Sequence, residues 1–466
     1  MRFFFLLSIV IFPLTFFSQI EIVGDWFGHL EIQNTKMKIV FHIFEENGKL
    51  AGKMDSPDQG AYGLNLNNVT YTKEKTIFDL SVFGIVYTGK LINKDSLEGN
   101  FMQGGFSQVL NLSKSKTEIL SKPNRPQEPK EPYPYTIKEV KFKNEFSGIE
   151  LAGTLTIPKK IGNFPAVILV SGSGAQNRNE ELLNHKPFHV LADYLTRHGI
   201  AVLRYDDRGV GESGGKFEGA TTADFAYDAQ SAYTFLKSQK KINKSRIGII
   251  GHSEGGMVAP MVACADSTVK FIILLAGPGI PISELMLKQT EVTSRFAGIS
   301  EEEIAISLEL NKKFYDILNN ESNDSVAKIK IEKIVNDHIN SMPSEIATQI
   351  GDELPKITST MLSPWFRYFI NFNPEHYLRQ INCPVLAING IKDCQVSAIE
   401  NLAGIRKSVK ETNNKNVYTY LMPDLNHLMQ HCETGSVNEY IKIEETFSEE
   451  VMKIMADWIK DFEIIK

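Results

Sequence analysis

The chain has 466 residues, of which 42% are hydrophobic and 23% are charged, and its formal net charge is −6. This composition is typical of a globular protein with room for two or three domains. The negative charge gives no electrostatic basis for binding nucleic acid or an anionic membrane. The four cysteines are too few for a disulfide framework and fit no metal site, so we expect no metal ion and no cofactor.

Residues 1–18 have the pattern of an export signal peptide. Arg2 precedes an apolar run that contains Pro13 and ends near Ser18. The run is too short to span a membrane comfortably, although an uncleaved anchor is the alternative. We expect cleavage after Ser18, no stable membrane insertion afterwards, and a periplasmic or secreted protein.

Residues 19–120 contain short alternating strands separated by polar turns such as Glu46-Asn-Gly48. This pattern predicts a small antiparallel barrel or sandwich. The opening Gly24–Gly28 and closing Gly99–Gly105 segments resemble the ends of lipocalin-like barrels. Residues 121–134 follow with five prolines, which predict a stiff, extended linker.

From residue 135 to residue 466, strands alternate with helices, which predicts an α/β domain with a mostly parallel sheet. A helical stretch without a clear strand, at about 280–380, indicates an inserted lid. The predicted strands are 151–157, 166–171, 200–205, 247–251, 271–276, 384–389 and 416–421.

The segment Gly251-His-Ser-Glu-Gly255 joins an apolar strand to a small-residue helix. This is the nucleophile elbow of the α/β-hydrolase fold, in which a sharp turn exposes the serine hydroxyl above the sheet. The same pattern recurs at Gly211–Gly215 without the strand–turn–helix context, so Ser213 is expected to be a turn residue. The predicted fold is therefore an α/β-hydrolase with a helical lid, preceded by a small all-β, barrel-like domain.

The other members of a catalytic triad follow Ser253 in the order that this fold requires. Asp393 and His427 come directly after the last two predicted strands. His427 would be the general base, and Asp393 would orient it and stabilise its charged form. Asp424 as the acid and His431 as the base are the alternatives. Three further histidines, expected to be structural, are His252, His185 and His189.

The oxyanion of the transition state requires backbone N–H donors. One should come from Glu254, which follows the nucleophile. The second should lie in the loop after an early strand, where Ser173 is the first choice and Gly174 the alternative. Asp206 and Asp207 precede Ser253 in the chain, so they are expected to stabilise the loop Asp207–Gly211.

The candidates for the substrate pocket are Trp365, Phe366 and Arg178. Trp365 and Phe366 could line an apolar acyl pocket, as could Phe369, although packing between lid and domain explains these aromatic residues equally well. Arg178 could instead orient the oxyanion loop.

Two cysteines flank the predicted triad. Cys394 follows Asp393, and Cys432 lies five residues after His427. Because the triad brings these loops together, a Cys394–Cys432 disulfide is geometrically possible. The alternative is two small buried residues.

Several segments together resemble bacterial carboxylesterases of the EstD type, which are related to serine aminopeptidases and prolyl oligopeptidase-like hydrolases. The resemblance covers roughly residues 140–466 and implies that Ser253, Asp393 and His427 form the triad. The expected activity is hydrolysis of short-chain or small carboxylic esters through an acyl-enzyme, with a small-molecule ester as partner. An amide hydrolase of the same fold and a non-catalytic binding protein are the alternatives. The segments are 171–180, 203–213, 251–256, 363–369 and 425–430.

Overall fold

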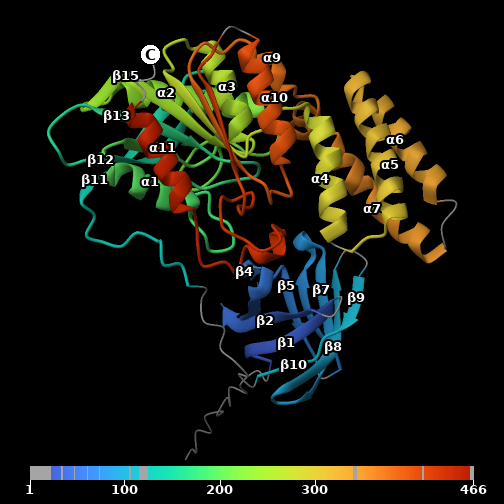
Figure 1. The fold of residues 1–466 in the computed structure, drawn as a ribbon. Coiled ribbons are helices and arrows are strands. Elements are labelled where there is room, and N and C mark those ends of the chain that lie inside the picture. Colours follow the sequence, from blue (N-terminus) through green and yellow to red (C-terminus); the bar gives the residue numbers. More distant parts are fainter. Residues whose placement is uncertain are drawn as a thin grey trace, which may run out of the picture. The chain divides into compact units, whose positions relative to one another are not determined.

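The computed structural model describes residues 22–461, except 33–34, 47, 60, 73, 104–105, 115–123, 297, 340–343 and 412–413 (Figure 1). The predicted signal peptide and the start of the predicted linker lie outside the described residues. The chain divides into two compact units, Met1–Leu120 and Ser121–Lys466. No helix in the described ranges is long and apolar enough to cross a membrane.

The first unit is an all-antiparallel sheet in the order β4-β3-β2-β1-β10-β8-β7-β6-β5, with β9 paired to β8. Among its described residues no pairing joins β4 to β5, so the sheet is a curled half-barrel where the sequence predicted a barrel or sandwich. The likeness to lipocalins stays a prediction. The strands are β1 (Gly24–Ile32), β2 (Thr35–Glu46), β3 (Lys49–Ser56), β4 (Ala61–Asn65), β5 (Asn68–Tyr71), β6 (Thr76–Leu80), β7 (Ile85–Asn93), β8 (Ser96–Gln103), β9 (Phe106–Val109) and β10 (Leu112–Ser113).

Alternation of apolar and polar residues gives this sheet one buried face. Phe41, Phe78 and Tyr87 meet there from three strands, with ring centroids 4.8 to 5.7 Å apart. Trp26 is also fully buried in this core. The first unit therefore has a hydrophobic core of its own.

The second unit contains an eight-stranded sheet in the order β11-β12-β14-β13-β15-β16-β17-β18. Strand β12 is antiparallel to both of its neighbours, and the remaining strands are parallel. This is the α/β-hydrolase arrangement, which confirms the predicted fold. The strands are β11 (Tyr135–Asn144), β12 (Ile149–Pro158), β13 (Phe164–Val170), β14 (Ala201–Tyr205), β15 (Ile242–His252), β16 (Phe271–Leu275), β17 (Val385–Gly390) and β18 (Val417–Met422).

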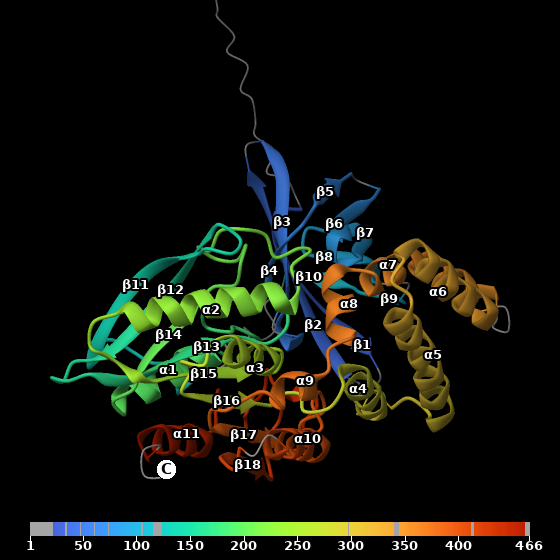
Figure 2. The same ribbon diagram turned by 90° about the horizontal axis from the view of Figure 1, so that it is seen from above.

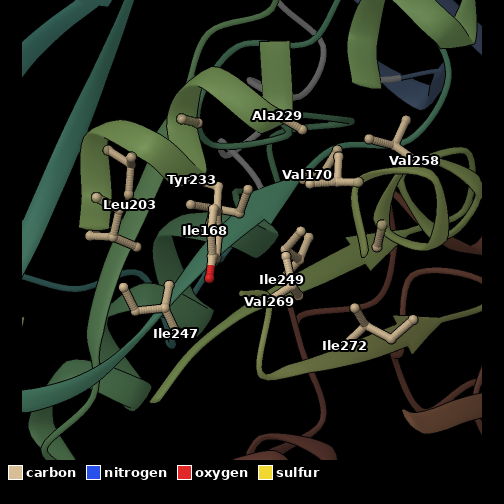
Figure 3. Packing of buried hydrophobic residues seen from close by; sticks show 14 of the residues in the cluster. Ile168, Val170, Leu203, Ala229, Tyr233, Ile247, Ile249, Val258, Val269 and Ile272 are labelled. Carbon is tan, nitrogen blue, oxygen red and sulfur yellow. The ribbon is translucent and has the colours of Figure 1, made fainter. Parts of the chain in front are cut away.

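Helices cover both faces of this sheet, so its central strands are apolar throughout. Val167 and Leu169 of β13 pack in the core with α1 and α11, whereas Ile168 and Val170 pack in the core with α2, α3 and α10. Figure 3 shows part of the core that contains Ile168 and Val170, where side chains of α2 and α3 meet those of the strands. These helices are α1 (Pro187–Arg197), α2 (Thr222–Ser238), α3 (Gly255–Ala265), α10 (Ala398–Lys410) and α11 (Glu449–Asp461).

The segment between β16 and β17 is helical in its described part, as predicted. It has its own apolar core, which includes Phe314, Leu318 and Ile331. Figures 1 and 2 both show α5, α6 and α7 grouped together away from the sheet. The helices are α4 (Ile282–Phe296), α5 (Glu301–Asn320), α6 (Asp324–Ile339), α7 (Ser344–Met361), α8 (Pro364–Ile370) and α9 (Pro374–Leu378).

The described part of the predicted linker, residues 124–134, is attached to the second unit. Arg125 donates side-chain hydrogen bonds to three backbone carbonyls that are distant in the chain. The Gln127 carboxamide pairs with the backbone of Phe447 through both its oxygen and its nitrogen. These residues are therefore part of the α/β unit. The carbonyls that accept from Arg125 are those of Leu183 (3.0 Å), Ile441 (3.0 Å) and Ile443 (2.9 Å).

Candidate active site

Ser253 lies at a sharp turn between β15 and α3. Its φ of 51° is in the left-handed region, which residues other than glycine rarely adopt and which is frequent at functional sites. The Ser253 N–H donates to the Leu275 carbonyl at 2.9 Å. A Cβ on Gly251 would lie 2.0 Å from the Gly255 oxygen, so this turn requires glycine at position 251.

Asp393 and His427 form a buried pair. Asp393 follows β17, His427 follows β18, and His427 Nδ1 lies 2.8 Å from Asp393 Oδ2. The other carboxylate oxygen accepts the backbone N–H groups of Gln395 and Val396, both at 2.8 Å. Because an ionised carboxylate only accepts hydrogen bonds, Nδ1 carries the proton and Nε2 is left as a base.

Ser253 and His427 line the same cavity, whose volume is about 270 Å³. Helices α4 and α8 supply most of its apolar wall, and three glutamine side chains supply polar groups. The apolar side chains are Leu182, Pro278, Ile282, Leu285, Met286, Trp365, Phe369, Val396 and Leu428, and the glutamines are Gln176, Gln289 and Gln395. The structure thus brings the predicted nucleophile and base together at a small, largely uncharged cavity.

Ser173 and Glu254 also line this cavity. Among the hydrogen bonds of the described residues, none uses the backbone N–H of either residue. The neighbouring Gly172 N–H, in contrast, donates to Glu180 Oε1 at 2.7 Å. Ser173 and Glu254 therefore retain the donors that an oxyanion requires, whereas Gly174 is not among the cavity-lining residues.

Arg178, a candidate for the substrate pocket, is not among the cavity-lining residues. Its guanidinium binds Asp206 at 2.6 and 3.0 Å and Glu212 at 2.7 Å, and it also contacts Glu139. Burial alone would raise the pKa of Asp206, but hydrogen bonds and the charge of Arg178 hold that pKa below its usual value. The residue orients the loop that carries Ser173, which was the alternative interpretation.

Asp207 holds the same loop from the other side. Its carboxylate accepts from Ser171 Oγ at 3.1 Å and from the Gln176 N–H at 3.0 Å. Burial raises the pKa of Asp207 to about 8, despite these hydrogen bonds. Asp206 and Asp207, which were predicted to stabilise the loop Asp207–Gly211, thus bind residues of the loop after β13.

Trp365 of α8 lines the cavity and donates from Nε1 to Glu254 Oε1 at 3.0 Å. The same oxygen accepts from Thr222 Oγ1 at 2.6 Å. Phe366, in contrast, is not among the cavity-lining residues. It packs in the lid core, where its ring centroid lies 6.4 Å from that of Tyr315.

The alternative triad residues have other partners. Asp424 lies 2.9 Å from Lys392 Nζ, and His431 lies 2.8 Å from Glu445, both outside the cavity lining. Ser213 Oγ donates to the Asp206 carbonyl at 2.7 Å, as expected of a turn residue. Neither histidine of the α1 region, His185 nor His189, is among the cavity-lining residues.

The Cys394–Cys432 disulfide that the sequence left possible is not formed, and both thiols are free. Cys394 Sγ donates to the Gly435 carbonyl at 3.2 Å, and Cys432 Sγ donates to the Asp424 carbonyl at 3.5 Å. The two thiols therefore bind different carbonyl groups. Cys394 is buried and Cys432 is half-buried, which is close to the alternative interpretation.

Sequence reasoning missed several cavity residues. Gln289 lies on α4 and Gln395 in the loop after β17, and neither type of residue marks a site by itself. The contact of Glu180 with His252, at 2.8 Å, was also missed. These two residues are 72 positions apart, so no spacing rule could have linked them.

Comparison with known proteins places the second unit among related hydrolases. Residues 185–343 match the family model described as serine aminopeptidase, S33. Esterase EstD of Thermotoga maritima is 27% identical over 296 residues, which are 63% of this chain and 61% of that protein. The thiohydrolase aneE of Aspergillus aculeatus is 30% identical over 37% of this chain and 50% of its own length. The chain thus spans less than two thirds of the length of each of these two relatives.

A solved structure, that of the Pyrococcus furiosus esterase Pf2001, aligns with 74% of this chain and 98% of its own. The sequence identity is 17% and the TM-score is 0.43.

We predict that Asp207→Asn changes the pH dependence of stability. The folded pKa of about 8 lies above the ordinary 3.8, so the stability that Asp207 contributes is fully present below about pH 4 and is lost as the pH rises toward 8. Relative to the variant, the free energy of unfolding of the wild type should fall by up to about 1.4 kcal/mol for each pH unit in that window. Urea unfolding of both proteins measures the difference, and parallel pH curves would contradict the prediction.

Proposed function

We propose that this chain, an α/β-hydrolase homologous to esterase EstD, is a serine carboxylesterase that hydrolyses short-chain or small carboxylic esters through an acyl-enzyme. One observation carries the proposal. A left-handed Ser253 and an Asp393-bound His427 line one small cavity. This combination has the parts that nucleophilic acyl transfer requires.

The reaction would proceed in two halves. His427 Nε2 takes the proton of Ser253 Oγ as that oxygen attacks the ester carbonyl, and the Ser173 and Glu254 N–H groups stabilise the oxyanion. His427 then gives the proton to the leaving alcohol, and Ser253 remains acylated. A water molecule, deprotonated by His427, attacks the acyl-enzyme and releases the carboxylic acid and Ser253.

The cavity favours a small, neutral substrate. Ligand pockets commonly measure about 300–1,000 Å³, and this cavity of about 270 Å³ lies just below that range. Its wall is mostly apolar, which suits an acyl chain.

The name of the matching family raises amide hydrolysis as a second candidate. An aminopeptidase would hold the substrate ammonium with a carboxylate. Glu180 and Glu254 both line the cavity, but Glu180 binds His252 and Gly172, and Glu254 binds Thr222 and Trp365. Both carboxylates already have partners, which favours the ester.

The proposal extends to location. The signal-like residues 1–18 support export to the periplasm or the exterior, where the enzyme would meet its ester substrate. Cell fractionation with an antibody against the folded chain tests this part.

We predict that Ser253→Ala lowers the turnover of p-nitrophenyl esters by roughly a millionfold, since the nucleophile is lost. Ser213→Ala is the matched control, because Ser213 is the other serine in a Gly-x-Ser-x-Gly pattern and lies outside the cavity lining. A fluorophosphonate should label the control and the wild type but not Ser253→Ala. Comparable turnover in the two variants would refute the assignment of the nucleophile.

Asp393→Asn should lower kcat by about 10⁴-fold, because an amide facing Nδ1 favours the wrong imidazole tautomer. Steady-state kinetics measure the loss. Asp424→Asn is the control, since that residue pairs with Lys392 outside the cavity lining. An equal loss in both variants, or in neither, would contradict the role of Asp393.

Met286→Ala should shift the acyl preference toward longer chains, because the truncation enlarges the cavity beside α4. One extra or missing methylene group in a hydrophobic pocket changes kcat/KM by about 10–200-fold. A panel of p-nitrophenyl esters from acetate to decanoate, with aminoacyl p-nitroanilides beside it, measures both the shift and the ester preference. Ile329→Ala, on the exposed side of α6, is the control. If Met286→Ala leaves the preference for acyl-chain length unchanged, Met286 does not limit the length of the acyl chain.

A further inference from the structure

A second buried acid–histidine pair lies beside the candidate triad. Glu180 Oε1 is 2.8 Å from His252 Nδ1, and His252 Nε2 is 2.9 Å from the backbone oxygen of His427. Both side chains are less than a tenth exposed. The acyl-transfer steps do not use either group.

The hydrogen-bond partners define the protonation of His252. Its Nε2 faces a carbonyl oxygen, which only accepts, so Nε2 must carry a proton. Its Nδ1 faces the carboxylate of Glu180, which also only accepts when ionised. The Gly172 N–H donates to the same Glu180 oxygen, which therefore acts as an acceptor there. With an oxygen facing each ring nitrogen, the geometry fits an imidazolium bound to a carboxylate.

The charged groups around His252 support this state. Burial alone would lower the pKa of His252, but the charge and hydrogen bond of Glu180, the His427 carbonyl and the charge of Asp393 raise it above the usual value. The His427 ring is the other titratable neighbour, with its centroid 4.9 Å from that of His252.

The pair connects three parts of the site. Glu180 binds the Gly172 N–H, directly before Ser173. His252 directly precedes Ser253, and it also binds the main chain of the base, His427. The loop after β13, the turn after β15 and the loop after β18 are thus joined by one chain of hydrogen bonds.

We infer that Glu180 and His252 form an ionic positioning pair, which sets the oxyanion donor, the nucleophile and the base at their working separation. The inference rests on the proposed esterase function. Loss of the His252 proton would leave Nδ1 or Nε2 without a hydrogen to donate and would release one of the three parts. The pair touches no reacting atom and acts through Ser173 and His427.

The test is the pH dependence of ester hydrolysis in variants that each retain part of the link. His252→Gln keeps an amide near the position of Nε2, and His252→Asn keeps one near Nδ1, but neither side chain titrates. Each should lower kcat by about 10–100-fold with little change in KM, because a small misplacement of reacting groups is costly. In the wild type, activity should fall at alkaline pH as His252 loses its proton. Each variant should lack this fall, because neither side chain titrates.

Glu180→Gln keeps the acceptor for Gly172 but removes the negative charge. It should move the alkaline limb to lower pH by about one pH unit or more. His185→Gln is the matched control, since His185 is also buried, binds the Tyr440 carbonyl at 2.8 Å and Thr446 at 3.0 Å, and lies outside the cavity lining. Its variant should keep the wild-type profile, and thermal unfolding reports whether each variant is folded.

A spectroscopic measurement separates this inference from the proposed function. Nitrogen NMR of histidine-labelled protein at neutral pH should show two protonated ring nitrogens on His252 and one on His185, whose pKa burial lowers to about 4. A wild type that hydrolyses no ester would defeat the proposed function, and the NMR would still test the pair. A single protonated nitrogen on His252, or wild-type kinetics and pH profiles in His252→Gln and Glu180→Gln, would overturn the inference.

Discussion

The close approach of the backbone at Gly251 and Gly255 is the constraint on which the site depends. A side chain at position 251 would collide with the Gly255 oxygen, so strand and helix can be joined by a turn this tight only with glycine there. The turn holds Ser253 in a left-handed conformation. The same closeness recurs at Gly172, where an added Cβ would lie 3.1 Å from Ser253 Cβ. A side chain at position 172 would therefore press on Ser253, although far less than one at position 251 would press on Gly255.

The α/β fold and the candidate triad could be predicted because their signals are local. Buried parallel strands are continuous apolar runs, and each predicted strand overlaps an observed one. Asp393 and His427 were found because this fold places the acid and the base after late strands. Strand β11 was missed, since it lies at the sheet edge and exposes charged residues such as Lys138, Glu139 and Lys141.

The side-chain contacts that the sequence did not reveal depend on long-range packing. Arg178 was placed in the pocket, but its direction is decided by Asp206, which is 28 residues away. Phe366 and Trp365 are neighbours on one short helix, and only packing decides which of them lines the cavity. The proline-rich segment looked like a free linker because nothing in its sequence reveals that Arg125 binds carbonyls more than 300 residues away.

The hydrogen bond between Trp365 and Glu254 gives the cavity a fluorophore of its own. The chain has three tryptophans, and the other two, Trp26 and Trp458, are buried in hydrophobic cores. Trp365 alone among them lines the cavity, with its indole N–H bound to the residue after the nucleophile. Indole emission depends on local polarity and hydrogen bonding, so acylation and deacylation of Ser253 would change the light that the protein emits. The catalytic cycle would then be visible in real time, without a coloured substrate.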